Sequence, residues 1–189
     1  MSVLTGSTER VTVRMRPPTK PQVEEATSGK ALRIVAAATR LGLGWIFVWA
    51  FFDKLLGLGH ETASKDAWIN GGHPTEGFLK FAASGPLKGL YNDIAGAAWA
   101  DWLFMAGLIG IGLALMLGIT MRMAAAGGVL LLVLMWSAVL PPENNVFMDD
   151  HLIYAGTLVM LLLLKAGHTL GLGRWWERLP LVQRFGFLK

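Results

Sequence analysis

The apolar residues of this chain gather into four long runs separated by polar stretches, rather than alternating along short amphipathic elements. The runs cover about residues 32–58, 102–119, 123–140 and 152–170. Each approaches the roughly 20 residues that an α-helix needs to cross ~30 Å of hydrocarbon. The pattern therefore predicts an all-α membrane protein, a four-helix transmembrane bundle, with the membrane domain over residues 31–176.

The polar stretches predict three further segments. Residues 1–30 are polar, basic and interrupted by Pro17, Pro18 and Pro21, which indicates a disordered tail. Residues 60–98 are too long for a simple connection and predict an external lid, with short helices at about 76–83 and 90–99 lying on the membrane surface. Residues 177–189 are expected to form a C-terminal tail.

Small residues predict how the helices pack. Gly110, Ala114 and Gly118 recur every four residues in the second run, and Ala124 and Gly128 repeat that spacing in the third. Such faces let two helix backbones approach closely. With the short turn at 120–122, they predict an antiparallel hairpin of the second and third helices.

Basic residues predict the orientation. They gather in the stretch up to Arg33 and again from Lys165 onward, whereas the segment after the first run carries only Lys65, Lys80 and Lys88. Because Lys and Arg concentrate on the cytoplasmic side, both termini are expected in the cytoplasm. The net charge of +4 is then explained by orientation and attraction to membrane lipid, and no nucleic-acid partner is expected.

Composition narrows the chemistry. The chain is 53% hydrophobic and only 16% charged, where soluble domains carry about a quarter charged residues, which excludes a soluble enzyme. It has no cysteine, which excludes disulfides, iron–sulfur clusters and covalently attached haem. The histidines lack the spacing of haem or metal ligands, so no metal site is predicted. Any redox cofactor must therefore be dissociable.

Three charged residues inside the first run need an explanation, because a charge at mid-helix costs about 3 kcal/mol to insert. They are Arg40, Asp53 and Lys54. At about 100° per residue, positions 40, 47, 51 and 54 share one helix face, so Arg40 and Lys54 are expected to point into the bundle. Trp49 and Phe52 fall on another face. Interfacial snorkelling of these charges is the competing interpretation.

A second polar cluster, Asp149, Asp150 and His151, opens the fourth run. It can cap the helix, or Asp150 and His151 can form a proton-transferring pair. In an antiparallel bundle, position 53 ends one helix and position 151 begins another at the same membrane depth. We therefore expect Asp53, Lys54, Asp150 and His151 to line one catalytic pocket covered by the lid.

Five segments of the sequence, taken together, resemble the DoxX family of four-span bacterial membrane proteins, including its thiosulfate:quinone oxidoreductase subunits. They are RLGLGWIFVWAFFDKL, AWINGGHPTEGFL, DWLFMAGLIGIGLALMLGITMR, LPPENNVFMDDHLIYA and GLGRWW, covering about residues 40–176. The resemblance implies a bacterial plasma-membrane enzyme that passes electrons from thiosulfate to membrane quinone, a dissociable cofactor. In that function Arg40 and Lys54 would hold anionic or carbonyl oxygens, and the quinone ring would pack against Trp49, Phe52 and Trp68.

A second hypothesis is a noncatalytic membrane anchor or scaffold subunit of a redox or stress-response complex. The basic tail and the lipid-facing aromatic residues support it. Both hypotheses allow a second redox subunit or a homo-oligomer. A small-solute transporter is disfavoured, because the sequence contains no inverted repeat or broken midplane helix.

Overall fold

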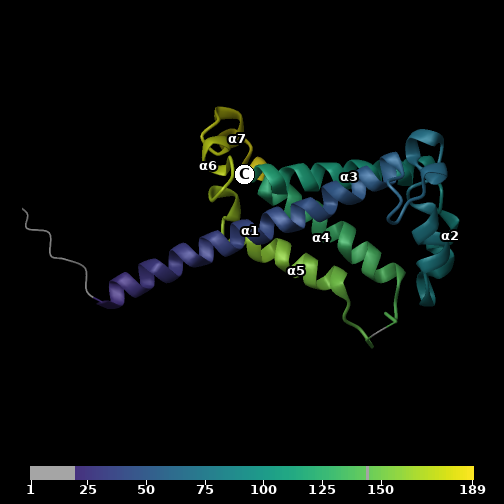
Figure 1. The fold of residues 1–189 in the computed structure, drawn as a ribbon, viewed down its shortest axis with the longest axis horizontal. Helices are drawn as coiled ribbons and strands as arrows, with labels where there is room; N and C mark the ends of the chain where they lie inside the picture. The colour runs from purple at the N-terminus through teal and green to yellow at the C-terminus, as the bar shows by residue number, and fades with distance from the viewer. Residues whose placement is uncertain (1–19, 144) are drawn as a thin grey trace, which may run out of the picture.

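The computed structural model describes residues 20–143 and 145–189, and this part of the chain is helical throughout its regular elements (Figure 1). The main helices are α1 (Lys20–Leu56), α3 (Ala98–Leu117), α4 (Met121–Ala138) and α5 (Asp150–Leu163). Three of them contain segments long and apolar enough to cross a membrane, namely Gly29–Leu56, Ala98–Leu117 and Met121–Ala138. The prediction of an all-α membrane protein is confirmed at this level; α5 is a shorter apolar helix of 14 residues.

Helix α1 begins earlier than expected. Residues 20–30 are helical, although they were predicted as part of a disordered tail. Pro21 is compatible with this start, because a proline in the first helical turn lacks only an N–H that would have had no helical partner. The N-terminal half of α1 extends well beyond the other helices in Figure 1. The remainder of the predicted tail, residues 1–19, lies outside the described residues.

Helix α5 ends earlier than expected, at Leu163 instead of Leu170. Lys165 has a left-handed backbone conformation with φ of 49°, and a short 3-10 turn, η5 (Ala166–His168), follows it. This turn places Gly167 against Gly118, where the two backbones are too close to admit a Cβ atom on either residue. The early end of α5 therefore allows the turn that follows it to contact the backbone at the end of α3.

Glycines permit close helix packing at the predicted Gly118 and Gly128, and also at Gly112, which the small-residue spacing did not single out. A Cβ on Gly112 of α3 would lie 2.7 Å from Val48 Cγ2 of α1, and a Cβ on Gly128 of α4 would lie 2.5 Å from Leu158 of α5. Gly110, in contrast, has open space where its Cβ would stand. The close pairs are thus α1 with α3 and α4 with α5, and Gly110 points out of the bundle. The predicted short connection between α3 and α4 is confirmed.

The segment between α1 and α3 contains only short elements. These are η1 (Ser64–Asp66), η2 (Trp68–Asn70), the π-helical turn η3 (Phe78–Ala82), η4 (Gly85–Leu87) and α2 (Lys88–Asp93). Its second half is fixed to the end of α4: Ser84 N–H donates to Ala138 O at 2.8 Å, and the Tyr91 hydroxyl lies 2.6 Å from Ser137 Oγ. The helix expected at 76–83 is the single turn η3, and the one expected at 90–99 is only partly formed, because α2 ends at Asp93 and Ala98 and Trp99 belong to α3.

At the opposite end of the bundle the C-terminal residues fold into α6 (Gly173–Trp176), α7 (Pro180–Arg184) and a final 3-10 turn, η6 (Gly186–Leu188) (Figure 1). Val182 is fully buried there. The main-chain N–H of Arg122 at the start of α4 donates to Lys189 O at 2.8 Å. The predicted tail of residues 177–189 is therefore folded back onto the bundle. We refer to residues 165–189 as the C-terminal lobe.

Candidate functional site

Arg40 points into the bundle, as the helical spacing predicts, and is fully buried. Its guanidinium donates to the main-chain oxygens of Leu115 and Met116 at the end of α3, the latter at 3.1 Å. It also donates to Leu170 O at 2.7 Å and more weakly to Thr169 O at 3.4 Å. The last carbonyls of a helix lack helical partners and carry the negative end of its dipole, so they suit a cation. Arg40 therefore ties α1 to the end of α3 and to the turn after α5.

The space around this guanidinium is narrow. A Cβ on Gly118 would lie 3.1 Å from Arg40 Nη1, and a Cβ on Gly171 would lie 3.1 Å from Nη2. Position 118 also favours glycine because its backbone is in the left-handed conformation, with φ of 71°. Close backbone packing thus surrounds the two terminal nitrogens, and they bind main-chain oxygens.

Asp53 and Lys54 bind the loop that follows α1. The Asp53 carboxylate is buried and accepts hydrogen bonds from the main-chain N–H groups of Glu61 at 3.1 Å, Thr62 at 2.9 Å and His60 at 3.3 Å. Lys54 Nζ lies 3.2 Å from Glu61 Oε2. Both predicted site residues therefore have partners within residues 60–62, and their contacts fix the direction in which the chain leaves the helix.

The three aromatic residues expected to hold a cofactor ring have different neighbours. Trp49 contacts Trp45 and His60, with ring centroids 6.0 and 5.1 Å apart. Phe52 is exposed on α1, as the spacing predicts. Trp68 packs edge-on against Trp102 of α3 at 4.6 Å. No contact among the described aromatic residues joins these three into one ring-binding box.

His151 makes its short contact with Asp149 instead of the expected Asp150. His151 Nδ1 lies 2.6 Å from Asp149 Oδ2 and 3.6 Å from Asp150 Oδ1. Asp149 is also the N-cap of α5, because its Oδ1 accepts the N–H of Leu152 at 3.2 Å. Helix capping and pairing with histidine, which the sequence left as alternatives, are thus combined in one carboxylate. Asp150 is largely exposed.

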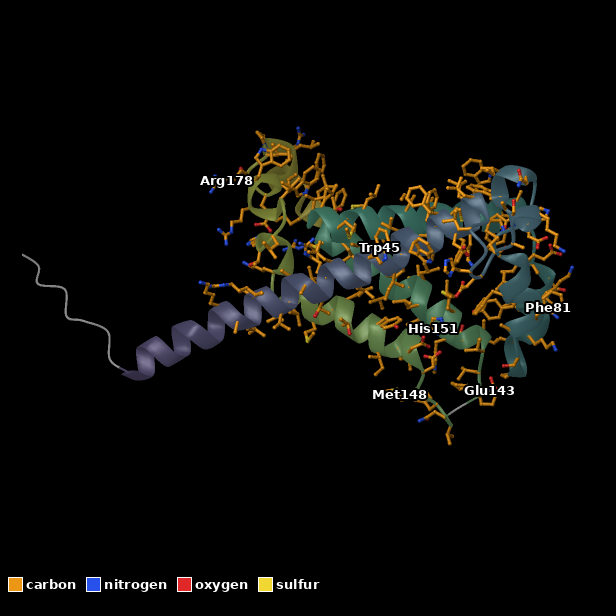
Figure 2. All side chains as sticks on the ribbon, viewed as in Figure 1. Trp45, Phe81, Glu143, Met148, His151 and Arg178 are labelled. Carbon is orange, nitrogen blue, oxygen red and sulfur yellow. The ribbon has the colours of Figure 1, made fainter. Side chains whose placement is uncertain are left out.

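The His151–Asp149 pair lies beneath the segment between α1 and α3. The His151 side chain is 17% exposed, and its ring lies edge-on to Phe78 of η3 with centroids 6.5 Å apart. Figure 2 shows His151 on the bundle near the end that carries Glu143 and Phe81. Within residues 20–143 and 145–189, no hydrogen bond or ion pair joins His151 or Asp150 to Asp53 or Lys54. The common pocket of these four residues stays a prediction.

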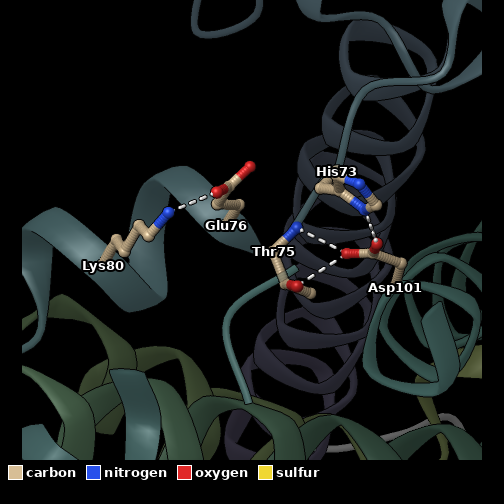
Figure 3. Close-up of polar contacts among 5 residues, drawn as sticks. All are labelled: His73, Thr75, Glu76, Lys80 and Asp101. Carbon is tan, nitrogen blue, oxygen red and sulfur yellow. Dashed lines mark hydrogen bonds and ion pairs between the residues drawn. The ribbon is translucent and has the colours of Figure 1, made fainter. Parts of the chain in front are cut away.

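Asp101, Thr75 and His73 form a third polar group, which the sequence pattern did not predict. Asp101, in the first turn of α3, is 1% exposed and accepts three hydrogen bonds (Figure 3). The donors are Thr75 N–H at 3.0 Å, Thr75 Oγ1 at 2.6 Å and His73, whose Nδ1 lies 2.8 Å from Asp101 Oδ2. An acid at the start of an apolar helix, with His and Thr in the preceding polar loop, is the signal that could have revealed it. This carboxylate anchors the loop to α3.

Beside that group, Glu76 and Lys80 form an exposed pair with Oε1 and Nζ 2.6 Å apart (Figure 3). The hydrogen bond and positive charge of Lys80 lower the pKa of the Glu76 carboxyl. Because the folded-state pKa is depressed, any stability from this pair is present above the pKa of the unfolded chain and is lost as the pH falls through the folded-state value. Exposed pairs at this spacing stabilise only weakly.

The described residues also form an apolar groove of about 360 Å³ on the outer side of the α3–α4 hairpin. Thr120 supplies the hydroxyl in an otherwise apolar lining made by Leu103, Ala106, Gly107, Gly110, Ile111, Ala114, Met123, Ala124, Gly127, Leu130, Leu131 and Leu134. The open space at Gly110 belongs to this groove. None of the charged residues described above lines this groove.

Comparison with known proteins adds no relative: no family model, curated protein or solved structure matches this chain. The similarity to the DoxX family therefore rests on the sequence segments alone.

Proposed function

We propose that this chain is a DoxX-like membrane oxidoreductase subunit in which α5 forms the fourth span. Helix α5 packs along α4 through the Gly128–Leu158 contact, so the two share one depth. At 1.5 Å per residue its 14 residues cover ~21 Å. Exposed apolar residues on both flanks, Phe147 and Met148 before it and Leu163 and Leu164 at its end, extend the lipid-compatible length.

The proposed reaction passes electrons from a small reduced sulfur anion such as thiosulfate to membrane quinone. Coupling two thiosulfates into tetrathionate releases two electrons, and a quinone that accepts them takes up two protons to become quinol. Neither half needs a cysteine or a bound metal relay. The protein's part is to bind the reactants, to orient them and to supply protons.

The observation that carries this proposal is the His151–Asp149 pair at the end of an apolar bundle. The carboxylate holds His151 through Nδ1, which leaves Nε2 as the nitrogen that can exchange a proton. The pair is mostly buried and the His151 ring lies edge-on to Phe78, at the end of the apolar helices, where a quinone ring would meet protons from water. Asp150, Asp53 and Lys54 are proposed to complete the polar surroundings.

The test is quinone reduction by the purified full chain. A soluble quinone analogue is mixed with thiosulfate, and loss of quinone absorbance is followed for the wild type and for His151→Gln. Because proton transfer by a positioned side chain typically contributes 10²–10⁴-fold, the variant is expected to lose at least tenfold in rate. His60→Gln is the matched control, since His60 is an exposed histidine in the loop after α1.

The scaffold hypothesis is the second candidate, and one observation favours it: Arg40 and Asp53 already bind main-chain groups. If the wild type neither reduces the analogue nor copurifies with quinone, the redox proposal is wrong. Copurification of a stoichiometric second polypeptide would then support the scaffold.

A further inference from the structure

The C-terminal lobe presents a surface of mixed cationic and apolar side chains. Trp175 and Phe187 are 57% and 58% exposed, and other large apolar residues beside them are also open: Leu170, Leu172, Leu181 and Phe185. Exposed basic residues alternate with them in sequence: Lys165, Arg174, Arg178 and Arg184. Arg184 lies over the Phe185 ring at 5.6 Å from its centroid. Cations and aromatic rings are thus presented by the same short elements.

The charge of this surface is one-sided. Residues 165–189 contain five Lys or Arg residues and a single acid, Glu177. Glu177 is itself occupied, because its Oε1 lies 2.9 Å from His168 Nε2. The arginine side chains of the lobe therefore have no carboxylate partner among the described residues, and the surface is complementary to an anion.

The lobe is held in place by specific contacts. Trp176 Nε1 donates to Leu188 O at 2.6 Å, and Arg122 Nη1 of α4 donates to Gly186 O at 2.7 Å. Leu172 N–H donates to Leu117 O at the end of α3 at 2.8 Å. These bonds fix the lobe at the ends of α3, α4 and α5, so its side chains are presented in one arrangement.

We propose that the C-terminal lobe binds the headgroups of anionic phospholipids. Its position at the ends of the membrane-compatible helices places it at the level where hydrocarbon gives way to headgroups. Tryptophan and other aromatic residues favour this interface, and arginine binds phosphate oxygens with two parallel hydrogen bonds. The exposed Leu and Phe side chains then contact acyl chains, while Arg174, Arg178 and Arg184 contact phosphodiesters.

A membrane lipid fits this surface better than a soluble polyanion does. A nucleic acid could contact the arginines through its phosphates and the aromatic rings through its bases, but it has no hydrocarbon chain that would cover Leu170, Leu172 and Leu181. A phospholipid satisfies both kinds of side chain at once. The proposal is independent of the redox function, because the lobe lies at the end of the bundle opposite to His151 (Figure 2).

The experiment measures lipid retention by the full chain. Wild-type protein is extracted from mixed vesicles of phosphatidylcholine and phosphatidylglycerol, and the bound lipids are counted by native mass spectrometry. The test variant carries Arg174→Gln, Arg178→Gln and Arg184→Gln. The matched control carries Lys65→Gln, Lys80→Gln and Lys88→Gln, three exposed cations at the other end of the molecule.

The wild type is expected to retain phosphatidylglycerol in preference to phosphatidylcholine. Because each of the three arginines attracts the anionic headgroup, the arginine triple variant should lose more than tenfold in that preference while the lysine variant keeps it. Equal retention of the two lipids by the wild type, or an equal loss in both variants, would overturn the proposal. Melting temperatures of both variants are measured alongside, because the substituted side chains are exposed and should leave the fold intact.

Discussion

Three buried charged residues of the described chain, Arg40, Asp53 and Asp101, bind groups from other segments. Arg40 binds carbonyls at the ends of α3 and after α5, Asp53 binds N–H groups of the next loop, and Asp101 binds Thr75 and His73. An ion moved out of water is costly unless hydrogen bonds replace its hydration, so each of these charges requires its loop to stay in place. Single residues thus determine where the connections lie.

Arg40→Leu is expected to destabilise the protein strongly. The substitution leaves the main-chain oxygens that Arg40 binds without their donor in a buried environment, and a buried acceptor left without its donor typically costs about 1–3 kcal/mol. The measurement is the melting temperature of the purified chain in detergent. Arg33→Leu is the control, because Arg33 is exposed on the same helix and its loss should change the temperature little. An unchanged melting temperature for Arg40→Leu, together with lost quinone binding, would give Arg40 a ligand-binding role instead.

At the scale of elements, the bundle consists of two close helix pairs. Gly112 lets α1 approach α3, and Gly128 lets α4 approach α5. The two pairs are joined through the α3–α4 hairpin, whose outer side carries the apolar groove. The two glycines of α3 therefore have different neighbours: Gly110 faces the groove, and Gly112 faces the backbone of α1.

This difference predicts different effects of the same substitution, glycine to alanine, on the stability of the protein. Gly112→Ala would bring a Cβ to 3.0 Å from the main-chain nitrogen of Val48, which cannot rotate away, so a loss of about 1–3 kcal/mol is expected. Gly110→Ala meets no atom within 4 Å and replaces a flexible residue in a helix, so stability should be unchanged or slightly raised. Melting temperatures of the two variants decide the matter. Equal destabilisation by both would contradict the packing described here.

The long elements could be predicted from the sequence because their apolar length and small-residue content are local properties. Their ends could not, since α5 stops at Leu163 in order to bring Gly167 to Gly118 and two carbonyls to Arg40, which are contacts between distant segments. The same limit applies to the site. Spacing on one helix correctly placed Arg40 inside the bundle, but it could not reveal that Asp149 holds His151 or that Asp101 holds Thr75.

The whole molecule has two chemically different ends. The C-terminal lobe and the protruding half of α1 lie at one end, and the segment from Gly57 to Ala97 lies at the other (Figure 1). Lys and Arg dominate the first end, whereas the second also carries many acids. This asymmetry leads us to expect the lobe in the cytoplasm and the segment with His73 and Asp101 outside it.

Cysteine labelling tests that orientation cleanly, because the chain has no cysteine of its own. Lys65→Cys and Arg174→Cys place a thiol on an exposed position at each end. A membrane-impermeant maleimide should label Lys65→Cys in intact cells and Arg174→Cys only after permeabilisation. The reverse pattern would place the lobe outside.

The contacts of Arg40 also bear on how the chain enters a membrane during synthesis. The carbonyls that it binds lie 75 to 130 residues further along the sequence, so none of them has been made when the first helix leaves the ribosome. Until then the guanidinium must remain hydrated or reach toward the headgroups. The first helix can settle at its final depth only after α3 and the turn behind α5 have been translated. Assembly of this bundle is thus completed by its last-made segments, and premature termination within α5 would leave Arg40 bound to the end of α3 but without the carbonyls of Thr169 and Leu170.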